Sequence, residues 1–277
     1  MKNIIVAFDF SKNAVHALDY AIKYANVFDS DINLVWVDNT GSRENIIDTI
    51  EGEIRIEKKK YLNDISEKYK NRLQKGTVKV VLRKGKVYQE IAKTARHLQA
   101  ELIFAGTHGV TGFEQFWIGS NAYRITTSAP CPVITVRPDF PTEQDINNIL
   151  LPLDSSLETK QKLPFAVKLA KGFDATLHLL KVYNTPLKLI RKRIDKFGND
   201  AETCLNDKEI RFITETIEVD NVAAGILNYA EKQNIDLISI MTEQGTTTAN
   251  KFLGPYAQQL INNSPIPVLS LRAKEYI

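Results

Sequence analysis

Residues 3–11 read Asn3-Ile-Ile-Val-Ala-Phe-Asp-Phe-Ser11, and residues 148–156 read Asn148-Ile-Leu-Leu-Pro-Leu-Asp-Ser-Ser156. The two stretches lie 145 residues apart, and the match runs on without a gap as far as Thr40 and Thr185. A second match joins residues 101–133 to residues 236–268, at a separation of 135 residues. A repeat of this length is too long for a solenoid and indicates two duplicated domains.

The segment between the two copies reads Arg137-Pro-Asp-Phe-Pro-Thr-Glu-Gln-Asp145. Prolines and polar residues without a hydrophobic period are typical of a linker. We therefore predict one domain at residues 1–140 and a second domain at residues 146–277, with the boundary near Pro138 to Asp145.

Short apolar runs rich in Val and Ile alternate with longer helical patterns in both copies. The runs are Ile4–Phe8, Ile32–Val37, Val78–Leu82, Leu102–Ala105 and Val133–Val136, then Ile149–Leu153, Thr176–Val182, Thr214–Val219, Leu237–Ile240 and Val268–Leu271. Helical spacing covers Ala14–Ala25, Ile46–Leu73, Val87–Leu98 and Ser120–Thr127. Apolar runs without polar alternation are typical of strands buried on both faces. The alternation predicts an α/β fold with a parallel, doubly wound sheet in each domain.

One predicted helix is densely charged, over Glu51–Lys75. Its residues Ile54, Tyr61, Ile65 and Leu73 are spaced to form a stripe that faces the core. The pattern favours a solvated amphipathic helix over a basic binding patch.

Charge and cysteine content limit the partners and the compartment. The chain of 277 residues has 36 Lys and Arg against 33 Asp and Glu, a net charge of +3, so we expect neither a nucleic-acid nor a membrane partner. Two cysteines, Cys131 and Cys204, provide no disulfide framework. The start of the chain lacks a signal-peptide core, and no apolar stretch approaches the roughly 18 residues of a membrane span. These features predict a cytoplasmic protein.

Glycines follow the fourth apolar run of the first copy, in Gly106-Thr-His-Gly109, and Gly119-Ser120 then opens a helix. In an open parallel sheet, ligands bind beyond the carboxyl ends of the strands. Glycine lets the backbone approach a ligand closely, and the free N–H groups at a helix start suit a phosphate. Turn and capping roles alone would also explain these glycines. Asp9 weakens that explanation, because it emerges at the same edge of the sheet.

At these residues the chain resembles the universal stress proteins, in their tandem two-domain form. The signature of their nucleotide-binding members is Gly, two residues, Gly, nine residues, then Gly-Ser or Gly-Thr. Gly106, Gly109, Gly119 and Ser120 match it at every position. The resemblance covers essentially the whole chain. It implies two five-stranded, Rossmann-like domains of the adenine nucleotide alpha hydrolase type, a role in the stress response, and bound ATP with Mg²⁺.

The same resemblance implies which residues hold the nucleotide. Asp9 and the backbone of Val37 would hold the adenine and ribose, with Ala7 and Phe8 beside them. Ala105 and Gly106 would border the nucleoside. The phosphates would be held by Gly109, Gly119, Ser120 and Asn121.

The second copy departs from the signature. Met241 stands in place of Gly106, Gln244 in place of Gly109 and Pro255 in place of Ser120, while Gly119 is retained as Gly254. Larger side chains would occupy the space for phosphates, and proline lacks the N–H of a phosphate-binding helix start. Asp154 remains opposite Asp9, and a structural role at the strand-to-helix turn is favoured over a nucleotide site. A different small pocket stays an alternative. We therefore expect one adenine nucleotide per chain, held by the first domain.

No committed catalytic set is visible near the predicted site. The sequence has no Gly-x-x-x-x-Gly-Lys-Ser/Thr loop, no histidines at metal spacing and no base placed to activate water. This favours a binding and signalling module over a fast enzyme. A slow ATP-hydrolysing switch is the second hypothesis, and a non-nucleotide small-molecule binder or structural pseudo-dimer is the third. The last strands of the two domains are expected to pair within the chain, and further homodimerisation is left open.

Overall fold

The computed structural model describes residues 1–39, 48–107, 119–242 and 253–273, and in the helix at Asp48–Lys70 it describes side chains from Ile56 on. The described residues form two compact units, one that ends at Pro138 and one that begins at Asp139. We call them the first and the second domain and describe each by itself.

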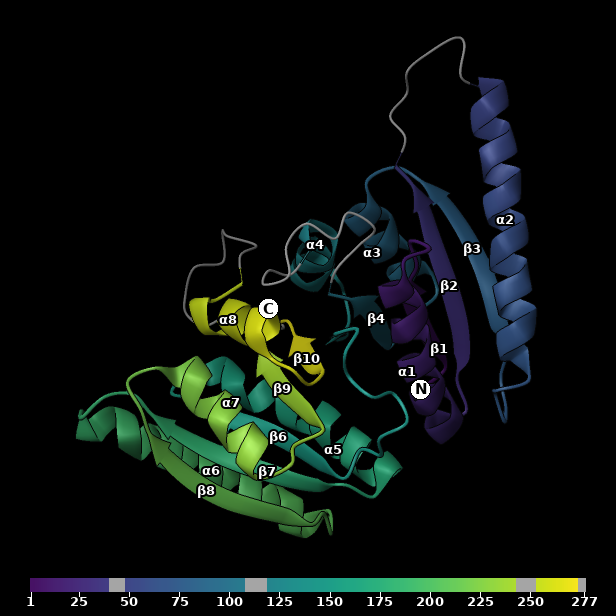
Figure 1. Cartoon of the computed structure of the whole chain (residues 1–277). Coiled ribbons are helices and arrows are strands. Elements are labelled where there is room, and N and C mark those ends of the chain that lie inside the picture. Colours follow the sequence, from purple (N-terminus) through teal and green to yellow (C-terminus); the bar gives the residue numbers. More distant parts are fainter. Residues whose placement is uncertain (40–47, 108–118, 243–252, 274–277) are drawn as a thin grey trace. The chain divides into compact units, whose positions relative to one another are not determined.

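The first domain is a five-stranded parallel sheet with helices between successive strands (Figure 1). Its elements are β1 (Asn3–Ala7), α1 (Lys12–Phe28), β2 (Asp31–Asp38), α2 (Asp48–Lys70), β3 (Val78–Lys84), α3 (Val87–His97), β4 (Leu102–Gly106), α4 (Ser120–Ser128) and β5 (Val133–Val136). The strand order is β3-β2-β1-β4-β5, and every pair is parallel. The predicted α/β fold is confirmed.

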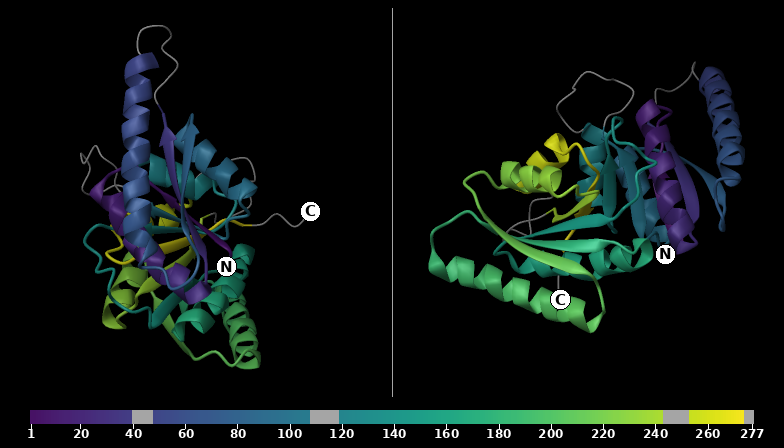
Figure 2. Two further views of the ribbon diagram at one scale, coloured as in Figure 1. Left: turned by 90° about the vertical axis from the view of Figure 1, so that its right-hand side faces the viewer. Right: turned by 60° about the horizontal axis from the view of Figure 1, so that its bottom comes forward.

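The second domain repeats this plan with one local difference. Its elements are β6 (Asn148–Leu153), η1 (Leu157–Lys162), α5 (Leu163–Phe173), β7 (Thr176–Tyr183), α6 (Lys188–Asp207), β8 (Phe212–Glu218), α7 (Val222–Lys232), β9 (Leu237–Met241), α8 (Pro255–Asn263) and β10 (Val268–Leu271). The order β8-β7-β6-β9-β10 matches that of the first sheet. Figure 2 shows α6 running along one face of this sheet, where it packs on β6, β7 and β8. The difference is η1, a turn of 3-10 helix that takes the place of the start of α1.

Side chains from the first sheet alternate between two helical layers. On one face Phe104 contacts the rings of Tyr20 and Tyr24 of α1, with centroid distances of 6.1 and 5.0 Å. On the other face Ile103 packs in a cluster with Ile91 of α3. Both faces of the strands are therefore buried, which explains why their sequences are continuously apolar.

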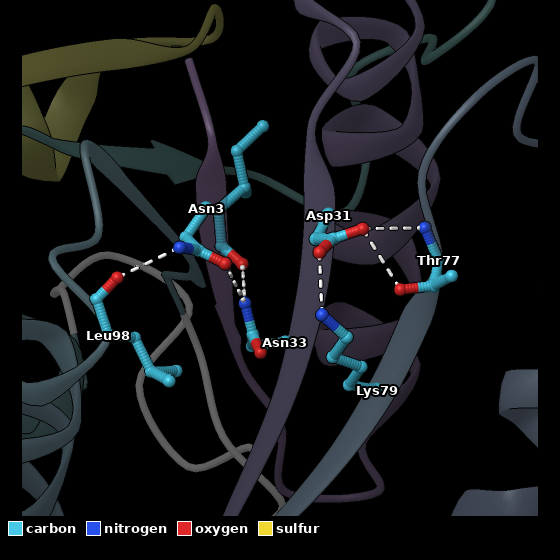
Figure 3. Close-up of polar contacts among 7 residues, drawn as sticks. Asn3, Asp31, Asn33, Thr77, Lys79 and Leu98 are labelled. Atoms are coloured by element: carbon cyan, nitrogen blue, oxygen red, sulfur yellow. Dashed lines mark hydrogen bonds and ion pairs between the residues drawn. The ribbon is translucent and has the colours of Figure 1, made fainter.

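The amino ends of the first strands are held by side-chain amides (Figure 3). Asn3 Nδ2 donates to the carbonyl oxygen of Leu98 at 2.9 Å, and Asn33 Nδ2 donates to Asn3 Oδ1 at 3.3 Å. In the second domain His178 Nε2 lies 3.2 Å from Asn148 Oδ1, at the matching positions. Both sheets thus have a pair of polar side chains between their first two strands, Asn3 with Asn33 in the first domain and Asn148 with His178 in the second.

Asp31 at the start of β2 holds the start of β3, also at the amino ends of the strands (Figure 3). Its Oδ1 accepts from the backbone N–H of Thr77 at 2.8 Å, and its Oδ2 accepts from Lys79 Nζ at 2.6 Å. Burial alone would raise the pKa of this carboxyl, but the hydrogen bonds from Lys79 and Thr77 outweigh it and lower the pKa. This edge is a structural one, and it lies at the opposite end of the strands from the predicted site.

The charged helix α2 buries only part of the predicted stripe. Tyr61 is 49% exposed, whereas Leu62 and Tyr69 are buried together with Ile65. The Tyr69 hydroxyl donates to Asp19 of α1 at 2.9 Å. The predicted amphipathic helix is present, and Ile65 is buried as predicted, but Leu62 is buried in place of Tyr61. Leu73 lies beyond the end of α2 and is partly exposed, and the side chain of Ile54 lies outside the described residues.

Candidate functional site

A cavity of about 340 Å³ lies at the carboxyl ends of the strands in the first domain. Its volume falls within the range of roughly 300–1,000 Å³ that is usual for ligand pockets. It is lined by nine of the ten predicted residues: Ala7, Phe8, Asp9, Val37, Ala105, Gly106, Gly119, Ser120 and Asn121. The tenth, Gly109, lies outside the described residues. Strand-end residues that are far apart in the sequence thus border one space.

Asp9 occupies the turn between β1 and α1. Its Oδ1 accepts from the backbone N–H of Ser11 at 3.0 Å and from Ser11 Oγ at 2.5 Å. The Ser11 hydroxyl in turn accepts from the N–H of Ala14 at 3.1 Å and so caps α1. These bonds fix the orientation of an exposed carboxylate on the cavity wall.

Gly106 ends β4 where α1 passes close by. A Cβ on Gly106 would lie 3.0 Å from the backbone carbon and oxygen of Asn13, which is tighter than ordinary packing. Helix–strand packing therefore accounts for this glycine without a ligand. It also brings the backbone of β4 to the floor of the cavity.

The start of α4 forms another part of the wall. Gly119 is its N-cap, with φ −56° and ψ 145°, and it provides no side-chain hydrogen bond to the helix. The N–H of Gly119 donates to the carbonyl oxygen of Thr107 at 2.7 Å, which ties the helix start to the end of β4. The amides of the first turn have no acceptor within the helix, and with the helix dipole they create a positive potential. The chemistry of this wall suits an anion.

Aromatic rings enclose the other side of the cavity. Phe8 is 3% exposed and contacts the ring of Phe10 at 5.5 Å, and Phe10 contacts Trp36 at 5.6 Å. Phe8 and Trp36 both line the cavity. A flat, partly apolar group such as a nucleobase fits a wall of this kind.

The sequence prediction missed several residues that line the cavity. The polar ones are Ser11, Asn39 and Thr107, and each directly follows a strand or lies two positions beyond a predicted residue. The strand-end rule could have found them. The apolar ones, Ala14, Val35, Trp36, Val87, Ile91, Ala122 and Ile125, could not be told from ordinary core residues.

The described residues support neither a reactive thiol at Cys131 nor a metal site built from protein side chains alone. The pKa of Cys131 is raised to about 12 by burial and by the Glu101 carboxylate, so its thiol stays protonated at neutral pH. The described ranges hold no group of three His, Cys, Asp or Glu side chains arranged for a metal ion. Within the same ranges, none of the helices is long and apolar enough to cross a membrane.

Comparison with known proteins identifies both halves of the chain. The model of the universal stress protein family matches residues 1–137 and again residues 145–272. The chain is 25% identical over 295 residues to the universal stress protein Slr1230 of Synechocystis sp., covering 98% of this chain and 100% of that protein. It is 27% identical over 147 residues to the universal stress protein YxiE of Bacillus subtilis, which matches 48% of this chain and is itself covered to 97%.

A solved structure shares the whole architecture. The crystal structure of a universal stress protein from Archaeoglobus fulgidus superposes with a TM-score of 0.80 at 20% identity, covering 98% of both chains. At this identity the likeness shows the fold alone.

Proposed function

This chain belongs to the universal stress protein family, and we propose that its first domain binds one molecule of ATP as a signalling module of the stress response. One observation carries the proposal: nine of the ten residues predicted to hold a nucleotide line one cavity at the carboxyl edge of the first sheet. The glycine spacing that resembles the nucleotide-binding signature also belongs to this domain.

The walls of the cavity suggest how the nucleotide lies. The start of α4, with Gly119, Ser120 and Asn121, suits the phosphates because its amides and dipole attract negative charge. Phe8 and Trp36 offer flat apolar surface to the adenine, and the Asp9 carboxylate can accept from ribose hydroxyls. Gly109 is expected at the phosphates as well.

Magnesium would accompany the phosphates. Of the described residues that line the cavity, Asp9 is the only acidic one. Mg²⁺ keeps several waters and commonly binds through substrate phosphates with one or two carboxylates. We therefore expect the ion to be held mainly by ATP itself and by water.

Release of the bound small molecule is the first test. The protein, purified without added nucleotide, is denatured, and the supernatant is analysed by liquid chromatography and mass spectrometry. ATP or ADP at up to one equivalent supports the proposal. The absence of nucleotide here, together with no heat signal on titration with Mg-ATP, contradicts it.

Two matched variants assign the site. Gly119→Val and Gly254→Val change equivalent glycines, whose φ angles of −56° and −57° both tolerate valine. A branched side chain at position 119 would cover the helix amides, so Gly119→Val should abolish ATP binding in calorimetric titration. Gly254→Val should leave the affinity nearly unchanged. Two equivalent sites in the wild type, or loss of binding in a folded Gly254→Val, would contradict the assignment.

The duplication of the domain bears on the oligomeric state of the chain. We expect the two domains of one chain to pair in the way that two copies of a single-domain protein would, which makes a monomer self-sufficient. Light scattering that finds an obligate dimer at low concentration would contradict this expectation.

A further inference from the structure

The second domain has its own cavity, of about 310 Å³. It is lined by Pro152, Leu153, Asp154, Ser155, Ser156, Val182, Asn184, Val222, Ile226, Ile240, Met241, Tyr256, Ala257 and Leu260. With the repeat offsets of 145 and 135 residues, all of these except Ser155 align with residues that line the first cavity. The duplication has therefore kept the cavity in the same place in the fold.

The chemistry of the lining has changed at the end of the fourth strand of the sheet, from small residues to large apolar ones. Ile240 and Met241 stand at the end of β9, where the first domain has Ala105 and Gly106. The helix start that suits an anion in the first domain is altered too, because α8 begins with Pro255, which has no N–H to donate. Asp154 and the N-cap glycine Gly254 are retained, but the small residues at the strand end and the first amide of the helix, which suit a triphosphate in the first cavity, are lost.

The larger side chains have not filled the space. The second cavity is nearly as large as the first, at about 310 against 340 Å³. In the first domain a side chain at Gly106 would meet the backbone of α1. In the second domain η1 replaces the first turns of that helix and packs on β9, whose last residue, Met241, is buried. The cavity is therefore retained although larger residues stand at the end of β9.

Charges at the base of this cavity compensate each other. Asp154 Oδ1 accepts from the backbone N–H of Ser156 at 2.8 Å. The ammonium of Lys162 is buried nearby, donates to Thr159 Oγ1 at 3.1 Å and to the carbonyl oxygen of Pro152, and interacts electrostatically with Asp154. One carboxylate and one ammonium leave no net charge to attract an ion. A neutral ligand suits this balance best.

A polar pair also lines the cavity. Asn184 Nδ2 donates to the Tyr256 hydroxyl oxygen at 3.4 Å, and both residues line the cavity. Because the oxygen accepts this bond, the hydroxyl proton can be donated to a ligand. Asn121 takes the place of Tyr256 in the first domain, so this donor on a large apolar ring belongs to the second cavity alone.

We propose that the second domain binds a small, uncharged and largely apolar molecule that carries one hydrogen-bonding group. Val222, Ile226, Ile240 and Leu260 would cover its apolar body, and the Tyr256 hydroxyl would meet its polar group. The chain would then bind two ligands of different chemistry, a ligand with an anionic group in the first domain and a neutral ligand in the second.

A neutral fluorescent probe tests this assignment. N-phenyl-1-naphthylamine is uncharged, has one N–H group and becomes bright in apolar surroundings. Titrated into the full chain with saturating Mg-ATP present, it should bind at one saturable site. Ala257→Phe, which fills the second cavity, should abolish the signal. The matched change Ala122→Phe in the first domain should leave it intact. No saturable binding, or displacement of the probe by ATP, would overturn the proposal.

A milder variant covers the case in which Ala257→Phe fails to fold. Tyr256→Phe keeps the ring and removes only the hydroxyl, so it should weaken probe binding about fivefold, because the second lone pair of the hydroxyl oxygen can no longer accept from the probe's N–H group. Naphthalene, which has no hydrogen-bonding group, should bind wild type and Tyr256→Phe equally in a competition assay. Unchanged affinity of the amine in Tyr256→Phe would contradict the assigned polar contact.

Discussion

The ammonium of Lys162 donates a hydrogen bond to the carbonyl oxygen of Pro152 from a side chain that is only 2% exposed. In the first domain the matching residue is Ala17, in the core of α1. The second domain therefore contains a buried cation that its counterpart lacks, and this cation makes the domain sensitive to pH.

Burial lowers the pKa of Lys162 to about 8, although Asp154 acts in the opposite direction. An unfolded lysine titrates near 10.5, so between pH 8 and 10 the unfolded chain binds more protons than the folded one. Stability should rise with pH in this window by up to about 1.4 kcal/mol per pH unit. Lys162→Met should lose this slope. Urea unfolding followed by circular dichroism at pH 7, 8, 9 and 10 measures it, and parallel slopes for the two proteins would contradict the prediction.

His178 should make the second domain weaker in acid. Burial lowers its pKa, with Glu215 acting in the opposite direction, and its ring lies 3.0 Å from the Tyr229 hydroxyl. The unfolded chain therefore takes up a proton first, and stability is lost as pH falls below about 6.5. His178→Asn introduces the residue that the first domain has at this position, Asn33, and should flatten the profile. Thermal melts from pH 5 to 7.5 test this, and equal acid sensitivity of the two proteins would count against it.

Two glycines should respond in opposite directions to alanine. Gly106→Ala brings Cβ to 3.0 Å from the backbone of Asn13, which cannot move freely, so we expect a loss of about 1–3 kcal/mol. Gly198→Ala lies inside α6 and meets mainly the flexible Lys181 side chain. It should stabilise the protein by about 0.5–1 kcal/mol through helix propensity. Chemical unfolding of both variants gives the signs, and two changes of the same sign would refute the packing argument.

Ser11 should matter more than its counterpart Ser156. Both serine hydroxyls donate to the aspartate two residues earlier, Asp9 and Asp154, but Ser11 Oγ also caps α1, whereas η1 has no side-chain cap. Ser11→Ala should destabilise the first domain by about 1 kcal/mol and weaken ATP binding, because the Asp9 carboxylate loses a partner. Ser156→Ala should have the smaller effect on stability and none on ATP. Calorimetry and unfolding on the pair decide this, and equal losses would show that the cap is not what distinguishes them.

Much of the fold could be predicted because buried parallel strands leave a strong trace in the sequence. The runs at Ile4–Phe8 and Ile149–Leu153 are apolar on both faces, and the repeat fixed the order of the elements. The burial of Tyr61 in α2 was predicted wrongly, because Tyr61 and Leu62 are adjacent apolar residues and periodicity alone cannot choose between them.

The residues of the candidate site could be predicted where they lie at or just beyond the carboxyl end of a strand. The 3-10 helix η1 could not be predicted, because its residues, Leu157–Lys162, align without a gap to the start of α1. The 3-10 helix occurs together with Met241 at the end of β9, far away in the sequence. A relationship between such distant residues leaves no local sequence pattern. The buried ammonium of Lys162 was missed for the same reason, since lysine in an amphipathic helix is ordinarily read as exposed.

The polar tie between Asn3 and Asn33, and the corresponding tie between Asn148 and His178, lie at the amino ends of strands whose other ends carry the cavities. A five-residue strand spans roughly 16 Å, so side chains at one end do not touch those at the other. The pairing register of the strands is therefore held by side chains that lie far from the cavities. A protein engineer could change the residues of either cavity for a new compound while the side-chain pairs at the amino ends of the strands stay the same, so the two cavities can be altered independently.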